Sequence, residues 1–406
     1  MNVYQPYLQS IEAQQDSMVQ MLSIWSAINS GSHNILGLSR MVETLASAFN
    51  VLGGNSEIIP LKPRTRIDSL GNLIEEPCGA ALRITKRLDA PITVLLGGHM
   101  DTVYPTDSSF QHTTRINDNT MRGPGVTDMK GGLIVMLKAL EALEASPFAK
   151  NIGWEVLINP DEELGSPSSE FLWVAAAKRH TCGLLFEPAF GDGSLVNARK
   201  GSANFTVVAK GRAAHAGRDF HQGRNAIAAI AHFIVAAEQI SDAHTGITLN
   251  IGHIEGGGPV NIVPDLAICR FNIRTMNPDD LEEIRQKLHN IIEQIHTQEG
   301  ISLTLHEQTF RAPKLFDEKH QQLFSAFETC AYALGSKLQS KPSGGACDGN
   351  ILAAEGLTTI DTLGVIGGNI HTSEEYILLN SLSQRTQLTA YFLMKLANHE
   401  IEVNFA

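Results

Sequence analysis

The sequence lacks most of the features that would assign it to a specialised class of protein. Its five cysteines are far apart, odd in number and include no C-x-x-C pair, which argues against a disulfide framework and a cysteine-type zinc site. No uninterrupted apolar run approaches the roughly 18 residues of a membrane span, and no secretory signal is visible. Basic residues number 31 against 43 acidic ones, which disfavours non-specific nucleic-acid binding. We therefore expect a soluble cytoplasmic protein that binds neither nucleic acid nor membrane.

The order of apolar patterns predicts two structural units. The chain of 406 residues is long enough for two domains. Helical periodicity occurs over 5–29, 36–50, 133–145, 167–179 and 317–335, and strand patterns occur over 57–61, 64–68, 81–86, 92–96, 152–159 and 182–186. Alternation of this kind predicts an α/β fold with a mostly parallel central sheet and helices on both faces.

A second pattern begins at Lys200–Gly201. From there the segments 204–210, 223–240, 247–254, 266–274, 278–299 and 301–308 read as strand, helix, strand, strand, helix and strand. That order is the self-contained ferredoxin-like βαββαβ unit. The proline and the charged residues at 311–314 indicate that the chain returns there to the first unit. We therefore predict one domain in two parts, 1–200 and 312–406, with a second domain inserted over 201–311.

The stretch PITVLLGGHMD, from Pro91 to Asp101, joins an apolar strand pattern to a polar end. Two glycines follow the strand, and then His99 and Asp101 lie two residues apart, on the same side of an extended chain. Open α/β sheets bind their ligands at the carboxyl ends of their strands. Taken alone, the stretch is equally typical of an ordinary strand exit with a structural histidine.

Further acidic or histidine residues follow other predicted strands or lie in nearby loops. They are Asp128, Glu162, Glu163, Glu187 and His371. Because the carboxyl ends of parallel strands meet at one edge of a sheet, we expect these residues to meet near His99. Histidines and carboxylates without thiols suit one or two zinc-like ions, and a shared carboxylate would hold two ions roughly 3.5–4 Å apart.

The adjacent acids Glu162 and Glu163 favour different roles for the two carboxylates. At a buried strand end they would repel one another unless a cation neutralised one of them. One could then bind the metal while the other stayed free as a base. Taken alone, the pair also fits a solvated loop or a helix N-terminus.

Seven motifs together carry a family resemblance. They are GGHMDTVYP, GPGVTDMKGG, NPDEELGS, LFEPA, GRAAHAG, NIVPDLAICRFNIR and GGNIHTSEEY, and they span residues from about 80 to 380. In content and order the chain resembles the co-catalytic zinc amidohydrolases, which include glutamate carboxypeptidase, the aminoacylases, and the acetylornithine and succinyldiaminopimelate deacylases. The inserted domain lies where that family carries its lid and dimerisation domain.

The resemblance implies two zinc ions per subunit, with Co²⁺ or Mn²⁺ as substitutes. His99 and Glu187 would bind one ion, and Glu163 and His371 would bind the other. Asp128 would bridge the two ions.

The resemblance also implies catalytic and substrate-binding residues. Asp101 would accept a hydrogen bond from the His99 ring, and Glu162 would take a proton from the attacking water and pass it to the leaving amine. His215 would cross from the lid of one subunit to the site of its partner in a homodimer. Arg274 and Asn261 would hold the carboxylate and the carbonyl oxygen of the substrate.

These expectations lead to a di-zinc metallohydrolase that cleaves an amide bond beside a free carboxylate. We expect a carboxypeptidase that releases a C-terminal amino acid such as glutamate from a small peptide or N-acyl substrate. An N-acyl-amino-acid deacylase and a catalytically silent binding relative are the alternatives. A nucleotide or redox enzyme is disfavoured because the glycine-rich stretch RGPGVTDMKGG follows a long polar loop and carries Asp128 where a phosphate would lie.

Overall fold

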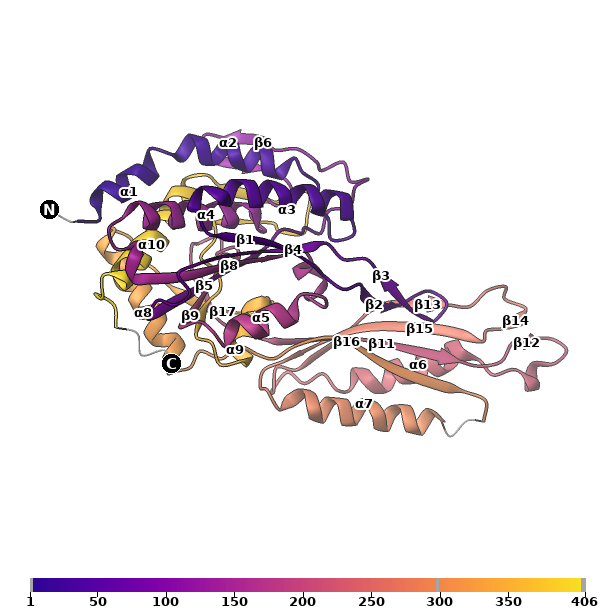
Figure 1. Cartoon of the computed structure of the whole chain (residues 1–406). Coiled ribbons are helices and arrows are strands. Elements are labelled where there is room, and N and C mark those ends of the chain that lie inside the picture. Colours follow the sequence, from indigo (N-terminus) through magenta and orange to yellow (C-terminus); the bar gives the residue numbers. More distant parts are fainter. Residues whose placement is uncertain (1–2, 297–298, 403–406) are drawn as a thin grey trace.

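A six-stranded sheet forms the centre of the larger unit in the computed structural model, which describes residues 3–296 and 299–402 (Figure 1). In spatial order its strands are β1 (Asn55–Pro60), β4 (Ala80–Lys86), β8 (Ile152–Asn159), β5 (Ile92–His99), β9 (Cys182–Leu185) and β18 (Thr359–Ile360). Strands β8, β5, β9 and β18 are parallel, whereas β4 pairs antiparallel with β8 and with β1. The mostly parallel central sheet expected from the sequence is confirmed.

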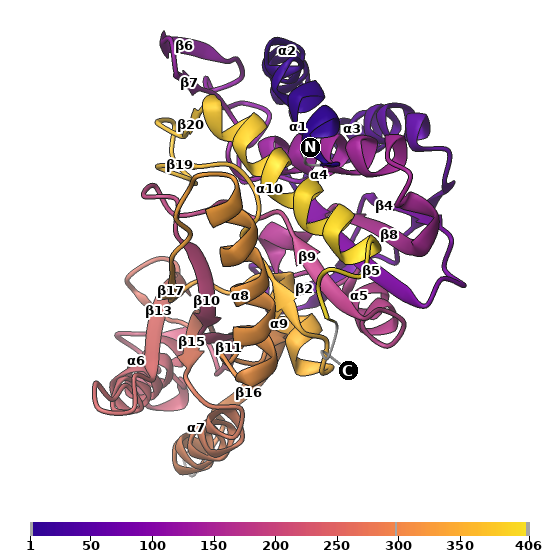
Figure 2. The same cartoon turned by 90° about the vertical axis from the view of Figure 1, so that its left-hand side faces the viewer.

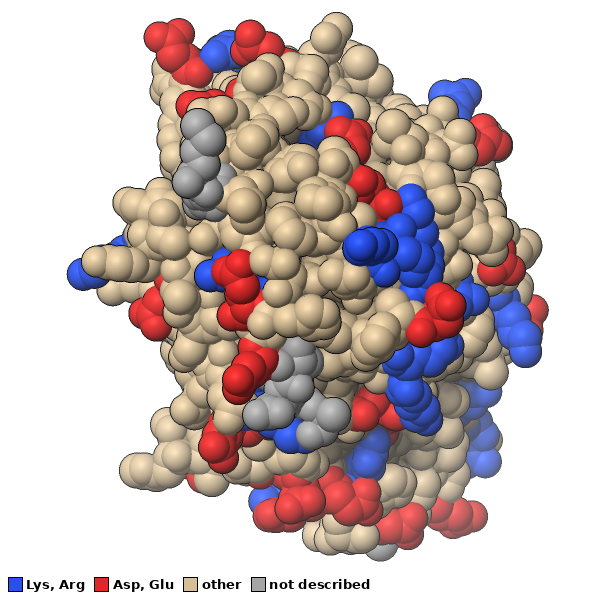
Figure 3. Space-filling model, turned by 60° about the vertical axis from the view of Figure 1, so that its left-hand side comes forward, with Lys and Arg blue, Asp and Glu red and all other residues tan. Residues whose placement is uncertain are grey.

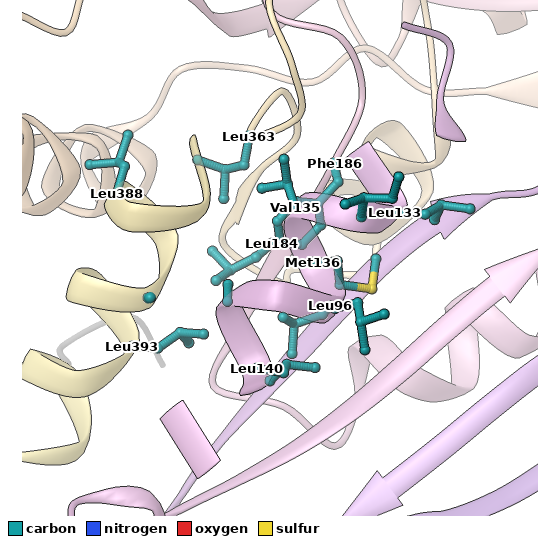
Figure 4. Close-up of a cluster of buried hydrophobic side chains, with 14 of the residues drawn as sticks. Leu96, Leu133, Val135, Met136, Leu140, Leu184, Phe186, Leu363, Leu388 and Leu393 are labelled. Atoms are coloured by element: carbon teal, nitrogen blue, oxygen red, sulfur yellow. The ribbon is translucent and has the colours of Figure 1, made fainter. Parts of the chain in front are cut away.

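Helices cover both faces of this sheet. On one face lie α1 (Gln5–Glu12), α2 (Gln15–Ser26), α3 (Ile35–Phe49), α4 (Lys130–Ala145), α8 (Glu318–Ala333) and α10 (Asn380–Ala397), and on the other lie α5 (Glu170–Ala177) and α9 (Asp348–Ala354). Alternation along β5 divides the core, because Leu96 packs with α4 and Leu95 packs with α5. Figure 4 shows Leu96 in one buried cluster with Leu140 of α4 and Leu393 of α10.

The single helix predicted over 5–29 is wrong, because the chain breaks between α1 and α2. The buried positions Leu8, Ile11, Met18 and Leu22 keep a helical spacing across the break. Both helices therefore present an apolar stripe to the same core, and periodicity alone could not reveal the interruption.

Among the described residues, one helical stretch is apolar and long enough to cross a membrane by length and composition alone. This stretch, Ile35–Leu52, has a mean hydropathy of 1.2 and comprises α3 and the short helix η1 (Asn50–Leu52). Its exposed face carries Arg40 and Glu43, while Met41, Leu45 and other apolar side chains enter the core. Its hydropathy is therefore explained by packing against the sheet.

The smaller unit is the predicted βαββαβ arrangement. It comprises β11 (Gly201–Lys210), α6 (Ala226–Glu238), β13 (Thr248–Gly256), β15 (Leu266–Thr275), α7 (Asp280–His296) and β16 (Ser302–Arg311). The antiparallel sheet has the order β13-β15-β11-β16, and both helices pack on one face around Phe205, Phe233 and Phe271. Residues 297–298 of the predicted helix lie outside the described residues. The domain boundaries stay a prediction.

Shorter elements complete the chain. They are β2 (Arg64–Ile67), β3 (Leu73–Glu76), β6 (Thr114–Asn117), β7 (Thr120–Arg122), η2 (Ala149–Asn151), η3 (Glu162–Leu164), β10 (Leu195–Arg199), β12 (Ala214–His215), η4 (Phe220–Gln222), β14 (Ile262–Val263), β17 (Ser340–Ser343), β19 (Gly367–Gly368) and β20 (Tyr376–Leu378). The β2–β3 hairpin reaches the sheet of the smaller unit, where Arg270 donates a hydrogen bond of 3.1 Å to the carbonyl of Ile67.

The two connections between the units run side by side. Arg199 and Lys314 exchange backbone hydrogen bonds of 2.9 and 3.0 Å. Both side chains also contact Asp361, which is fully buried in the larger unit. The two chain connections to the smaller unit, whose helices α6 and α7 are seen end-on at the lower side of Figure 2, thus lie next to each other.

Charged side chains are distributed unevenly over the surface. On the face shown in Figure 3, basic side chains gather on one side with acidic side chains among and below them, and large areas carry no charge. The overall net charge is −12. This face therefore presents no single-sign field.

Candidate functional site

The glycines before His99 allow two helices to pack against the end of β5. A Cβ atom on Gly97 would lie 2.7 Å from Trp173 of α5, and one on Gly98 would lie 2.5 Å from Met129 beside α4. Because glycine permits these contacts, the strand end is enclosed from both faces. The His99 side chain is consequently 1% exposed.

The five residues predicted as metal ligands lie together. Asp128 stands between two imidazoles, with its Oδ1 atom 3.1 Å from Nε2 of His99 and its Oδ2 atom 3.2 Å from Nε2 of His371. Glu187 Oε1 lies 3.8 Å from His99 Nε2, and Glu163 Oε2 lies 3.2 Å from His371 Nε2. Each histidine therefore faces Asp128 and one glutamate.

A second grouping of ligand atoms is also present. Side-chain atoms of His99, Glu162 and Glu187 all lie within 4.8 Å of one another, as do those of His99, Asp128 and Glu163. The geometry thus brings Glu162, predicted to be a free base, close enough to take part in metal binding.

The electrostatics of this cluster favour a bound cation. Burial and the nearby Asp128 raise the pKa of Glu163 to about 8, and burial raises the pKa of Glu187 well above its usual range. Asp128 is also buried, but the imidazoles of His371 and His99 hold its pKa below the ordinary value. Carboxylates crowded in this way become fully ionised only when positive charge is added. The donor set of imidazoles and carboxylates fits a zinc-like ion.

Asp101 organises the loop after β8 as well as His99. Its carboxylate lies 3.3 Å from His99 Nδ1, while its backbone carbonyl lies 3.0 Å from the same nitrogen. The carboxylate also accepts hydrogen bonds from the backbone N–H groups of Glu162 and Glu163, at 3.2 and 3.1 Å, and from the Ser32 hydroxyl at 2.8 Å. Asp101 therefore aligns the two adjacent glutamates.

Glu162 has a charged partner that the sequence did not predict. Arg311, the last residue of β16, donates a hydrogen bond of 2.7 Å to Glu162 Oε1. The same guanidinium donates to Asp348 at 2.8 Å and to the Ser166 hydroxyl at 2.9 Å, and it is 7% exposed. A strand of the smaller unit thus supplies the cation beside the predicted base.

A cavity of about 880 Å³ lies beside these residues. The larger unit lines it with Asp128, Glu162 and Glu187, and the smaller unit lines it with Asn250 and Arg274 among others. The Arg274 side chain is half-buried, and its guanidinium has no hydrogen bond or ion pair within the described ranges 3–296 and 299–402. Burial and the charge of Arg311 lower its pKa. An unpaired guanidinium facing a cavity is suited to capture a carboxylate.

His215 and Asn261 lie elsewhere. They belong to the tip of the smaller unit near β12 and β14, which Figure 1 places at its far end, and neither lines the cavity. The structure of one chain therefore does not bring these two predicted residues to the predicted metal ligands. The Nδ1 atom of His215 accepts hydrogen bonds from the backbone N–H groups of Gly217 and Arg218, which leaves the proton on Nε2.

Comparisons with known proteins agree with this architecture. A model of peptidase family M20/M25/M40 matches residues 95–395. Carboxypeptidase G2 of Pseudomonas sp. (strain RS-16) is 27% identical over 308 residues, which cover 75% of this chain and 74% of the relative. Succinyl-diaminopimelate desuccinylase 1 of Alteromonas mediterranea is 27% identical over 354 residues, which cover 82% of this chain and 90% of the relative.

The likeness extends to solved structures. An M20 family metallo-carboxypeptidase from Sulfolobus solfataricus superposes with a TM-score of 0.74 at 17% identity, covering 94% of this chain and 99% of that one. At this identity the superposition shows the common fold alone. Because the family model covers most of the chain, the protein belongs to peptidase family M20/M25/M40 and is an enzyme of this metallopeptidase and amidohydrolase class.

Proposed function

We propose that this enzyme is a di-zinc hydrolase that releases a C-terminal amino acid, such as glutamate, from a small peptide or N-acyl substrate. The observation that carries the proposal is Asp128, whose two carboxylate oxygens face His99 and His371 beside a cavity that also contains an unpaired Arg274. A shared carboxylate is the arrangement that two neighbouring metal ions require.

The contacts support the proposed ligand set. His99 and Glu187 would hold one ion, Glu163 and His371 would hold the other, and Asp128 would contribute to both. When bound, zinc supplies Lewis-acid chemistry at the scissile carbonyl and lowers the pKa of water. Imidazoles and carboxylates also accept Co²⁺ or Mn²⁺, so these ions are expected substitutes.

Glu162 transfers the proton in the proposed reaction. Its carboxylate accepts a proton from the water that attacks the carbonyl carbon, and it gives that proton to the amine as the C–N bond breaks. Arg311 keeps the carboxylate in place from the side of the smaller unit. The Asp101 carboxylate accepts a hydrogen bond from the backbone N–H group of Glu162 and so holds the backbone of that residue.

Arg274 determines where the substrate carboxylate lies. Among the described residues of the cavity wall, its guanidinium is a cation without an acidic partner, so a free carboxylate beside the scissile amide is the group we expect there. A C-terminal amino acid carries that carboxylate on the leaving side. The desuccinylase relative makes N-acyl-amino-acid deacylation the second candidate, because that reaction also leaves an amino acid with a free carboxylate.

A substrate panel tests this function. Zinc-loaded enzyme should hydrolyse dipeptides and benzoyl-amino acids that end in a free carboxylate, and amidation of that carboxylate should lower kcat/KM at least tenfold. Faster hydrolysis of N-acetyl or N-succinyl amino acids than of any peptide would favour the deacylase. Equal rates on free and amidated substrates would refute the role of Arg274.

We also propose a homodimer in which His215 acts in the site of the partner. The smaller unit exposes Ile227 and Val235 of α6, Ile254 of the edge strand β13, and Val260 at the tip. Exposed apolar groups beside an edge strand favour association with a second copy. His215 carries its proton on Nε2, so it can donate a hydrogen bond to a carbonyl oxygen.

Mixing two inactive variants tests the dimer. His215→Ala and Glu162→Gln should each be nearly inactive as homodimers. In a mixed dimer, one site has its own Glu162 and receives the partner's intact histidine, so equal mixing should restore up to about a quarter of wild-type activity. Subunit exchange without any recovery would show that His215 does not act across the dimer.

A further inference from the structure

We propose that Glu375 is the residue that positions the bridging ligand Asp128, by joining three of the loops that carry the metal ligands. This inference rests on the proposed metal site. It concerns a buried glutamate that is not itself among the ligands and that lies four residues after His371 in the sequence HTSEEY.

The Glu375 carboxylate accepts hydrogen bonds from one compact group of donors. Its Oε1 atom accepts hydrogen bonds from the backbone N–H groups of Thr127 and Asp128, at 2.8 and 3.0 Å. Its Oε2 atom accepts a hydrogen bond of 3.0 Å from the backbone N–H group of Gly125 and lies 2.7 Å from the Tyr104 hydroxyl. The side chain is 0% exposed, so water does not compete for these bonds.

These contacts connect segments that are distant in the sequence. Gly125 to Asp128 form the turn before α4, Tyr104 follows the His99–Asp101 segment, and Glu375 belongs to the loop of His371. The Tyr104 hydroxyl also lies 2.8 Å from the carbonyl of Thr372. One carboxylate therefore sets the relative positions of the loops that carry His99, Asp128 and His371.

The backbone at His371 shows why this loop needs an anchor. His371 has a φ of 63°, and Asn369 has a φ of 54°, in the left-handed region that non-glycine residues rarely adopt. Such conformations persist only where the surroundings enforce them. That constraint comes from residues that follow His371 in the sequence. They are Glu375, through its hydrogen bonds, and β20, which pairs with β7.

A carboxylate matches this donor group. Three backbone N–H groups point at its two oxygens, and a carboxylate can accept on both, while the Tyr104 hydroxyl has one proton for two neighbours, Glu375 and the carbonyl of Thr372. A glutamine in the same place would turn its NH₂ group either toward Thr127 and Asp128 or toward Gly125 and Tyr104. In either orientation at least one backbone N–H group would lose its acceptor and face a donor in a buried site.

The neighbouring Glu374 provides a matched control. It differs from Glu375 in having a side chain that is 62% exposed, and its partner is Arg122 on the surface. Glu374→Gln and Glu375→Gln therefore make the same chemical change at adjacent positions. Only the second alters the turn that carries Asp128.

The test measures zinc affinity and apoprotein stability, independently of turnover. Metal-free variants are titrated with zinc in competition with a chromophoric chelator, and the Tm of each apoprotein is measured. We expect Glu375→Gln to weaken zinc binding about 10- to 100-fold, as loss of a group that orients metal ligands usually does. Glu374→Gln should stay within twofold of wild type.

Tyr104→Phe gives a second, milder readout, and it decides the matter if Glu375→Gln does not fold. It removes the hydroxyl and leaves the three backbone bonds, so zinc affinity should fall about three- to tenfold. The proposal is overturned if Glu375→Gln lowers only the apoprotein Tm, or if Tyr104→Phe binds zinc as wild type does. If the wild-type protein itself binds no zinc, the proposed function fails instead.

Discussion

Replacement of Glu162 by glutamine would separate the proposed proton transfer from the proposed metal binding. The glutamine side chain would have nearly the same shape, and its carbonyl oxygen could still accept the hydrogen bond from Arg311 that is now 2.7 Å long. It could not accept a proton from water at neutral pH. We expect kcat to fall about 10²- to 10⁴-fold, which corresponds to about 2.7–5.4 kcal/mol of lost transition-state stabilisation.

The cost to folding should be much smaller. The Arg311 guanidinium would lose one anionic partner but keep Asp348, 2.8 Å away, so no buried cation is left unpaired. Weakening one charge-assisted hydrogen bond costs about 1–2 kcal/mol. The variant should therefore fold, with a Tm a few degrees below that of the wild type.

The assay combines kcat at saturating substrate, zinc content by atomic absorption, and Tm. Glu307→Gln is the control, because it also weakens a glutamate–arginine ion pair, at 2.7 Å to Arg285, on the smaller unit. A rate within threefold of wild type would refute the assignment of Glu162 as the proton-transfer group. A loss of zinc would instead make Glu162 a ligand, as its position beside His99 and Glu187 permits.

Three further predictions concern a ligand, the substrate and acid stability. His371→Ala should lower bound zinc from two ions to about one per chain, because Asp128 and Glu163 lose their imidazole partner, and an unchanged count by atomic absorption would contradict this assignment. Arg274→Met should raise KM at least tenfold for substrates with a free carboxylate and much less for amidated ones, as measured by initial rates. Burial acts to raise the pKa of Glu155, but hydrogen bonds from His180 and other groups outweigh it and hold the pKa at about 2. The folded-state pKa is thus below the unfolded one, so about 3 kcal/mol of stability is present above pH 4.5 and lost as pH falls toward 2. Urea unfolding of Glu155→Gln should show lower stability at pH 7 and a weaker acid dependence, and an unchanged acid dependence would contradict the pairing.

Much of the fold could be predicted from the sequence because local patterns match the observed elements. The apolar run before His99 forms β5, and the βαββαβ order follows from six consecutive segments. The predicted ends of elements are less accurate than the elements themselves, because an apolar pattern does not mark the residue at which an element ends. Strand β16 continues to Arg311, three residues past the predicted end, because pairing with Ser202 of β11 extends the ladder.

The predicted ligands came together because all but His371 lie at or just beyond strand ends or at the start of α4. Partners such as Arg311 and Glu375 could not be predicted in this way. The local sequence of Arg311 indicates only the return between domains, since nothing in it points to Glu162, 149 positions away. Glu375 had a weak local signal, because a second pair of adjacent acids follows His371, but only the fold shows which of the two is buried.

The side-by-side junction at Arg199 and Lys314 has a consequence for protein engineering. Inserted domains whose ends lie close together can usually be removed and the gap closed with a short linker. Here such a deletion would also remove Arg311. Glu162 and Asp348 would then lie near one another without their shared cation, and their repulsion would raise a pKa beside the proposed metal ligands. A shortened enzyme would need a replacement cation at that position, for example one introduced in the linker itself.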